Sequence, residues 1–137
     1  MTNEEYGRYV DALAPRSKTG KNLLNAFWVG GLICAIGQAL LNGYQALGLD
    51  ETTAGAAVSI SLVLLSAILT GFAVYDDIAK FAGAGTLVPI TGFANAVVAP
   101  AIEFQTEGFV LGTAAKMFTI AGPVIVYGTL AAVVYGA

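Results

Sequence analysis

The sequence contains no histidine and a single cysteine, Cys34, among its 137 residues. Zinc and haem centres are built largely from histidine and cysteine ligands, so neither kind of site is expected. One cysteine cannot form an internal disulfide, and nothing in the chain points to an oxidising compartment. No nucleophile lies beside a credible base, and no Walker-type phosphate loop is present. We therefore expect no metal, no cofactor and no catalytic site.

Charged side chains are scarce, at 11% of residues, while hydrophobic residues make up 57%. That balance lies outside the usual range of soluble domains. The basic residues are also segregated, because four of the six (Arg8, Arg16, Lys18 and Lys21) precede the first long apolar run. Since lysine and arginine collect on the cytoplasmic side of membranes, we expect residues 1–21 to form a cytoplasmic N-terminal segment. The expected surroundings are a lipid bilayer, with no nucleic acid as partner.

Four long stretches carry no charged residue, at positions 22–49, 52–75, 81–102 and 117–137. Each is long enough for the roughly 20 helical residues that cross a hydrocarbon core of about 30 Å. The sequence therefore predicts an all-α integral membrane protein with about four membrane segments, in a single membrane domain over residues 22–137. The expected spans are 23–47, 53–74, a broken 81–104 and 108–135.

A short amphipathic helix is predicted over residues 3–13, ahead of the first apolar run. It would place Tyr6, Tyr9, Val10 and Leu13 on one side, and Pro15 would end it. Two interpretations stay open, a helix lying along the membrane surface and a helix that docks a partner.

The third apolar stretch holds an unusual set of helix-breaking residues: Gly83, Gly85, Pro89 and Gly92. These residues disfavour a straight continuous helix. We expect a non-helical or re-entrant stretch over residues 81–89, followed by a short helix beginning near Thr91 or Gly92. Such backbone is tolerated at membrane depth only where it is buried in protein or lines a water-filled cavity. Helix N-termini there would suit a carboxylate, so these four residues are candidates for a solute pathway.

Two polar side chains near this stretch are further pathway candidates, Asn95 and Lys116. The Asn95 amide would hydrogen-bond a permeating solute or tie two helices together. Lys116 would attract an anionic solute, opposite Glu103 or Glu107, or it would lie at the interface and snorkel. The choice depends on whether residues 108–135 form one long helix or a short piece followed by a span that begins at Met117.

Glycines in the first span, Gly30, Gly31 and Gly37, would let helices approach closely in lipid. We expect them to form helix-packing or oligomer contacts. Ser59, Ser61 and Ser66 in the second span are available for hydrogen bonds between helices.

Four aromatic residues lie toward the ends of the predicted spans: Trp28, Tyr44, Tyr75 and Tyr135. Tryptophan and tyrosine are enriched where a membrane meets water. We therefore expect these four side chains to belong to interfacial belts.

Several ordered motifs carry a resemblance to a known family. They are Gly30-Gly31-Leu32-Ile33-Cys34-Ala35-Ile36-Gly37-Gln38, Leu69-Thr70-Gly71-Phe72 with Tyr75-Asp76, Phe81-Ala82-Gly83-Ala84-Gly85, Val88-Pro89-Ile90-Thr91-Gly92-Phe93-Ala94-Asn95, Glu107-Gly108, Val110-Leu111-Gly112 and Met117-Phe118. Together they resemble the SpoVA family of endospore-forming bacteria over about residues 29–128. Within that family, the N-terminal segment and the motif at residues 92–95 are more similar to the AC-type than to the AE-type members.

The resemblance implies a protein of the spore inner membrane that acts with other SpoVA subunits, as a homo- or hetero-oligomer. It implies movement of dipicolinic acid, with calcium, during sporulation and germination, and opening under membrane tension. It carries no catalytic residues to this chain and assigns no pore-lining position.

Three functions remain open at this point. The first is a channel subunit, because four short spans enclose little volume and a pathway for a planar dianion needs several chains. The second is an alternating-access carrier, favoured by the broken third stretch and by a faint repeat that relates residues 31–35 to 92–96. The third is a non-conducting assembly subunit.

Overall fold

The computed structural model describes residues 2–13 and 18–136, and within these ranges it contains helices and turns and no strand. The helices are α1 (Asn3–Leu13), α2 (Thr19–Ala46), α3 (Glu51–Gly71), α4 (Val74–Ala82), α5 (Ala84–Leu87), α6 (Ile90–Glu103), the 3-10 turn η1 (Gln105–Glu107), the π-helix η2 (Phe109–Ala114) and α7 (Ala115–Gly136). The predicted all-α membrane fold is confirmed, with three helices of membrane length and a broken fourth segment.

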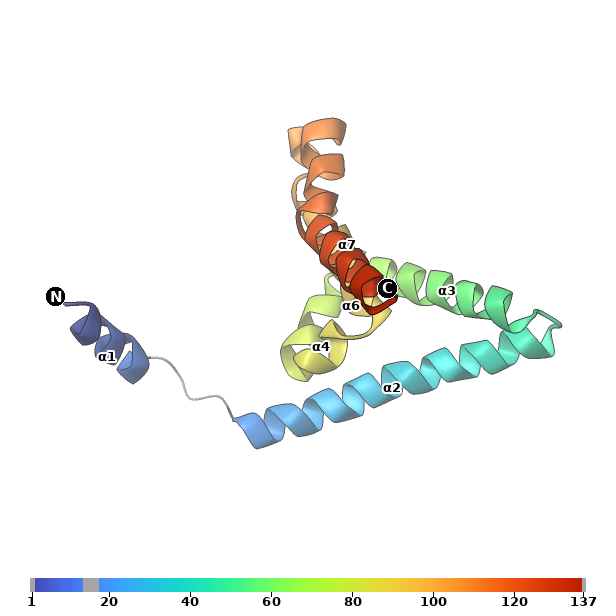
Figure 1. Cartoon of the computed structure of the whole chain (residues 1–137), viewed down its shortest axis with the longest axis horizontal. Coiled ribbons are helices and arrows are strands. Elements are labelled where there is room, and N and C mark those ends of the chain that lie inside the picture. The colour runs from blue at the N-terminus through green and yellow to red at the C-terminus, as the bar shows by residue number, and fades with distance from the viewer. Residues whose placement is uncertain (1, 14–17, 137) are drawn as a thin grey trace.

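Helix α1 coincides with the predicted amphipathic helix and lies apart from the rest of the chain in Figure 1. Its apolar side chains Tyr6, Tyr9 and Leu13 are all exposed. Pro15, the predicted end of this helix, lies outside the described residues. The cytoplasmic placement of residues 1–21 stays a prediction.

Helices α2 and α3 form a long hairpin, which Figure 1 shows along one edge of the molecule. At 1.5 Å per residue they are about 42 Å and 31 Å long, enough to cross a membrane. Asp50 starts α3, because its carboxylate accepts hydrogen bonds from the backbone N–H of Thr53 (3.1 Å) and from the Thr53 hydroxyl (2.6 Å). These bonds lower the pKa of Asp50.

The second span ends earlier than predicted. Helix α3 stops at Gly71, not Val74, and Ala73 takes a left-handed conformation with φ of 58°. The chain turns there and begins a separate nine-residue helix, α4. That conformation is uncommon for residues other than glycine, asparagine and aspartate, so the sequence carries no ordinary signal for this break.

The third stretch is broken as predicted, but the break has a different form. Residues 81–89 were expected to be largely non-helical, whereas α4 continues to Ala82 and α5 adds another turn before the chain breaks again at Val88–Pro89. Gly83 separates the two helices with φ of 54°. Helix α6 then begins at Ile90 and, with 14 residues, is only about 21 Å long. That length is too short to cross a hydrocarbon core of about 30 Å.

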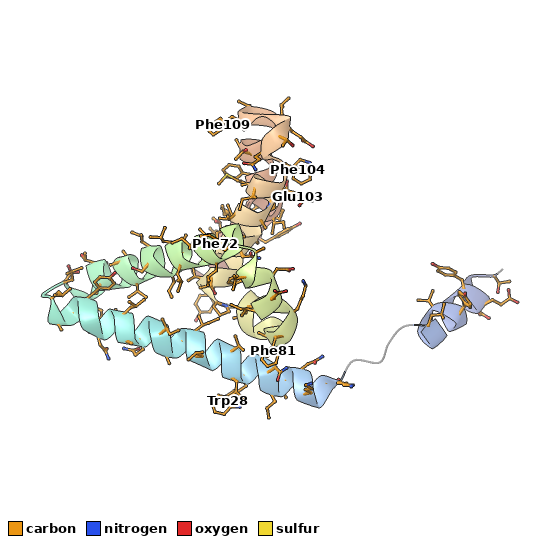
Figure 2. All side chains as sticks on the ribbon, turned by 180° about the vertical axis from the view of Figure 1, so that it is seen from behind. Trp28, Phe72, Phe81, Glu103, Phe104 and Phe109 are labelled. Atoms are coloured by element: carbon orange, nitrogen blue, oxygen red, sulfur yellow. The ribbon has the colours of Figure 1, made fainter. Side chains whose placement is uncertain are left out.

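Residues 109–136 form one continuous helix, the π-helix η2 running directly into α7. The long-helix alternative for this region is therefore the one the structure adopts. Gly108, with φ of 100°, reverses the chain between α6 and η2. Gly112 is packed so closely beneath this turn that a side chain there would meet the carbonyl oxygen of Phe104. Figure 2 shows Phe104 and Phe109 together at this tip of the molecule.

The chain exposes far more surface than a soluble protein of its size. Its accessible area is 10049 Å² at 14.0 kDa, whereas a folded soluble monomer of that mass exposes about 6,700 Å². Large apolar side chains such as Trp28, Phe72 and Phe109 account for much of it, each at least two-thirds exposed. Lipid or other protein chains must cover this surface.

Candidate functional site in the broken segment

The broken segment, residues 74–103, is held to α3 by a set of hydrogen-bonded polar side chains. We call this set the polar cluster, and its members are Ser66, Thr70, Tyr75, Thr86, Thr91 and Asn95. They come from α3, α4, α5 and α6. Among the described residues, no buried side-chain nitrogen or oxygen lacks a hydrogen-bond partner.

The centre of the polar cluster is buried. Ser66 is fully inaccessible, and its hydroxyl donates to the Thr91 carbonyl oxygen at 2.6 Å. Tyr75 is 4% exposed, and its hydroxyl lies 3.2 Å from both the Thr86 carbonyl oxygen and the Thr91 hydroxyl. These bonds satisfy polar groups that would otherwise be costly to bury.

Asn95 lies at the edge of the polar cluster and links two helices. Its side-chain oxygen is 2.8 Å from the Thr70 hydroxyl, which also lies 2.7 Å from the Ser66 carbonyl oxygen. Asn95 therefore ties α6 to α3, the second of the two roles predicted for it from the sequence.

The same amide also faces a pocket of about 260 Å³ beside the broken segment. Asp76 of α4 and Glu103 of α6 line this pocket together with Thr70 and Asn95. Asp76 is ion-paired with Lys80 of the same helix at 2.6 Å, whereas Glu103 has no ion pair among the described residues. The unpaired Glu103 carboxylate makes the pocket better suited to a cation or a neutral species than to a free anion.

The predicted glycines and proline of the pathway all lie within the broken segment and make its close turns possible. A side chain on Gly85 would meet the backbone of Ala26 in α2, and one on Gly92 would meet the Thr86 and Leu87 carbonyl oxygens. Pro89 precedes α6 in an extended conformation with ψ of 160°. Gly85 and Gly92 thus let backbone approach backbone, whereas Gly83 supplies the positive φ between α4 and α5 and has no close neighbour.

Lys116 lies away from the polar cluster, at the far end of α6. Its ammonium sits 4.1 Å from the centroid of the Phe104 ring, a cation–π contact. Asn95 precedes Phe104 by nine residues, which is about 13 Å along α6 by helical rise. In the part of the chain that the structure describes, no ion pair joins Lys116 to Glu103 or Glu107.

The three candidate packing glycines of α2 have different surroundings. Gly30 packs against Gly85, whose carbonyl oxygen lies 3.3 Å from the point where a side chain on Gly30 would begin. Gly37 is in ordinary contact with Leu62 of α3. Gly31 faces open space and is exposed, so it is free to contact another chain.

The prediction that Tyr75 belongs to an interfacial belt is wrong, because the side chain is only 4% exposed. The side chain is buried in the polar cluster because α4 packs against α2, α3 and α5. A tyrosine near the end of an apolar run is ordinarily interfacial, so only the unpredicted break at Ala73 explains its burial. Tyr44 also has a partner within the hairpin, the Ser61 hydroxyl at 2.7 Å.

Comparison with known proteins places this architecture in a family. The family model for SpoVAC/SpoVAEB sporulation membrane proteins matches residues 22–137. The chain belongs to this family. It is also 50% identical over 139 residues to stage V sporulation protein AC of Bacillus subtilis (strain 168), covering 99% of this chain and 93% of the relative. No solved structure matches the chain.

Membership of the SpoVAC/SpoVAEB family makes the chain a sporulation membrane protein. The match covers α2 to α7, including the whole broken segment and the polar cluster, and it begins after α1. The resemblance stated from the motifs is therefore confirmed, and so is its similarity to the AC-type members.

Proposed function

We propose that the chain is a subunit of a channel in the spore inner membrane, with its N-terminus on the cytoplasmic side. The channel moves dipicolinic acid, with calcium, during sporulation and germination, and opens under membrane tension. The observation that carries this proposal is the broken segment with its buried polar cluster. Irregular backbone at membrane depth is tolerated where it is buried in protein or lines a water-filled cavity, and transporters build their solute sites from such broken helices.

The pocket at Asn95 supports the transport of dipicolinate together with calcium. A free dianion beside the unpaired Glu103 carboxylate would be repelled, and moving it into a medium of low dielectric constant would be costly. Calcium neutralises both carboxylates of dipicolinate, so the 1:1 chelate carries no net charge. A neutral chelate with exposed oxygen atoms suits a pathway lined by amide, hydroxyl and carboxylate groups.

The small number of buried hydrophobic side chains supports an assembly of several chains. Only six hydrophobic side chains are buried among the described residues, and most of α2 and α7 is exposed. A hydrophilic pathway needs protein on all sides, because lipid cannot line it. Further copies of this chain or other SpoVA subunits would supply the missing walls.

Efflux from liposomes tests this function. Purified protein is reconstituted into vesicles loaded with calcium dipicolinate, and release after an osmotic downshift is followed by luminescence of external terbium. We expect rapid release from wild-type vesicles and several-fold slower release with Asn95→Leu. The matched control is Asn42→Leu on the exposed surface of α2, which should release at the wild-type rate. Folded wild-type protein that releases nothing would point to an assembly subunit without a pathway of its own.

A further inference from the structure

A wholly apolar pocket of about 180 Å³ lies between α2 and α3, and neither the family nor the proposed pathway accounts for it. Its walls include Ile33 and Ile36 of α2 and Leu62, Leu65 and Leu69 of α3. The side chain of Tyr75 closes its inner end. Every lining atom that remains accessible is apolar, because the polar atoms of the neighbouring polar cluster bond to one another.

The pocket between α2 and α3 is bounded by two packing contacts, one on each side of it along the hairpin. Toward the turn, α2 and α3 touch through Gly37 and Leu62 and through the Tyr44–Ser61 hydrogen bond. Toward the start of α2, α5 packs against the hairpin, where Gly85 closely approaches the backbone of Ala26. The pocket occupies the gap between these two contacts.

The pocket is partly open, and its rim is formed by Leu32, Ile36 and Leu65, which are between 41% and 61% exposed. These residues lie in the middle part of α2 and the second half of α3, both of which are long and apolar enough to span the membrane. Hydrocarbon chains are therefore the solvent at the mouth of the pocket. An apolar cavity of about 150 Å³ in a soluble protein stays free of water and takes up an apolar molecule.

We propose that one acyl chain of a membrane phospholipid occupies this pocket. The size excludes a helix of a second copy, because an α-helix with its side chains is about 10 Å wide. The lining offers no free hydrogen-bonding group, which excludes a polar ligand. Each methylene buried there also regains the dispersion contacts that an empty pocket would lack.

The bound acyl chain would lie against the polar cluster. Tyr75, Thr86 and Thr91 line the pocket and are hydrogen-bonded to one another within the broken segment. The Thr91 carbonyl oxygen also accepts a hydrogen bond from Ser66, which holds the segment to α3. Withdrawal of the acyl chain would leave a void beside Tyr75, Thr86 and Thr91. A void destabilises a packed interior by an amount that grows with its volume. The packing of the surrounding lipid would thereby act on the stability of the broken segment.

Cross-linking from the lipid chain tests the site on the unaltered protein. The full chain is reconstituted in vesicles of phosphatidylglycerol that carries a diazirine midway along one acyl chain, and labelled residues are mapped by mass spectrometry. We expect labelling of residues 29–36 and 62–69 on the pocket side to exceed labelling of the outward-facing Leu64 and Ile60 several-fold. Equal labelling of the two sides would show only the ordinary lipid annulus and would overturn the proposal.

Filling the pocket supplies the second test. Ile33→Phe and Leu65→Phe place additional volume in the pocket, and Leu64→Phe, one residue along on an exposed side of α3, is the matched control. Native mass spectrometry of protein extracted in mild detergent should show one retained phospholipid for wild type and for Leu64→Phe, and several-fold less for the pocket variants. Retention unchanged in the pocket variants, or absent from wild type, contradicts a chain held in this pocket.

Discussion

The hydroxyl of Tyr75 and the hydroxyl of Thr91 lie 3.2 Å apart, joining α4 to the first turn of α6 across the break at Pro89. Ser66 of α3 bonds to the carbonyl oxygen of the same threonine. Three helices are thus fastened at one residue, although the chain between them is interrupted at Ala73, Gly83 and Pro89. The stability of the broken segment depends on this polar cluster more than on helix continuity.

Removing the Tyr75 hydroxyl should loosen this junction. We expect Tyr75→Phe to lower the free energy of unfolding by about 1 kcal/mol, because the ring stays buried while its hydrogen bonds are lost. Denaturant unfolding in mild detergent, followed by circular dichroism, measures the change. The matched control is Tyr127→Phe, whose side chain is 73% exposed. Equal effects of the two substitutions would show that the Tyr75 bonds contribute nothing.

The close contact of α5 with α2 should tolerate no side chain at Gly85. We expect Gly85→Ala to destabilise the fold by about 2 kcal/mol, since the added methyl group meets the rigid backbone of Ala26. Gly31→Ala is the control, because nothing lies within 4 Å of a side chain there and alanine favours helix. Thermal unfolding of both variants compares them directly. A Gly85→Ala protein as stable as wild type would mean that α2 and α5 do not pack as described.

Gly31 is the α2 glycine best placed for contact between chains. We expect Gly31→Leu to reduce the oligomer mass while helical content stays the same, because the leucine fills the space that a neighbouring helix needs. Light scattering after size-exclusion chromatography reports the mass. Gly43→Leu, at another open position of α2, serves as the comparison. If the oligomer mass of Gly31→Leu is unchanged, Gly31 does not lie at the interface between chains.

Lys116 and Phe104 should be energetically coupled. A double-mutant cycle with Lys116→Met and Phe104→Leu is expected to give a coupling free energy of about 0.5–1 kcal/mol, the usual strength of an incompletely buried cation–π pair. Unfolding of the four proteins in the same detergent measures it. Additive effects would show that the two side chains do not interact, and Lys116 would then be available to a solute.

The sequence was sufficient for those parts of the fold that depend on length and polarity. Charge-free runs located α2, α3 and α7, and glycine and proline located the interruption before α6. The amphipathic pattern of residues 3–13 likewise predicted α1 with its observed bounds. These features depend on local composition, which is visible without any knowledge of packing.

The parts that the sequence did not predict depend on contacts between distant residues. The break at Ala73 needs an alanine in the left-handed region, which packing alone selects. Burial of Tyr75 follows from that break, and so does the meeting of Ser66 with Thr91, 25 residues further along the chain. The π-helix over residues 109–114 is another example, since no residue type specifies it.

Recording of single-channel current tests the channel proposal most directly. Wild-type protein alone is placed in a planar bilayer or membrane patch with calcium dipicolinate present and excess calcium chloride, so that calcium serves as the charge carrier because the pocket at Asn95 suits a cation, and tension is raised by suction. We predict discrete openings above a threshold tension, with altered ion selectivity for Asn95→Leu and unaltered selectivity for Asn42→Leu. A folded, correctly inserted protein that stays silent at every tension short of membrane rupture would contradict the claim that this chain forms a channel.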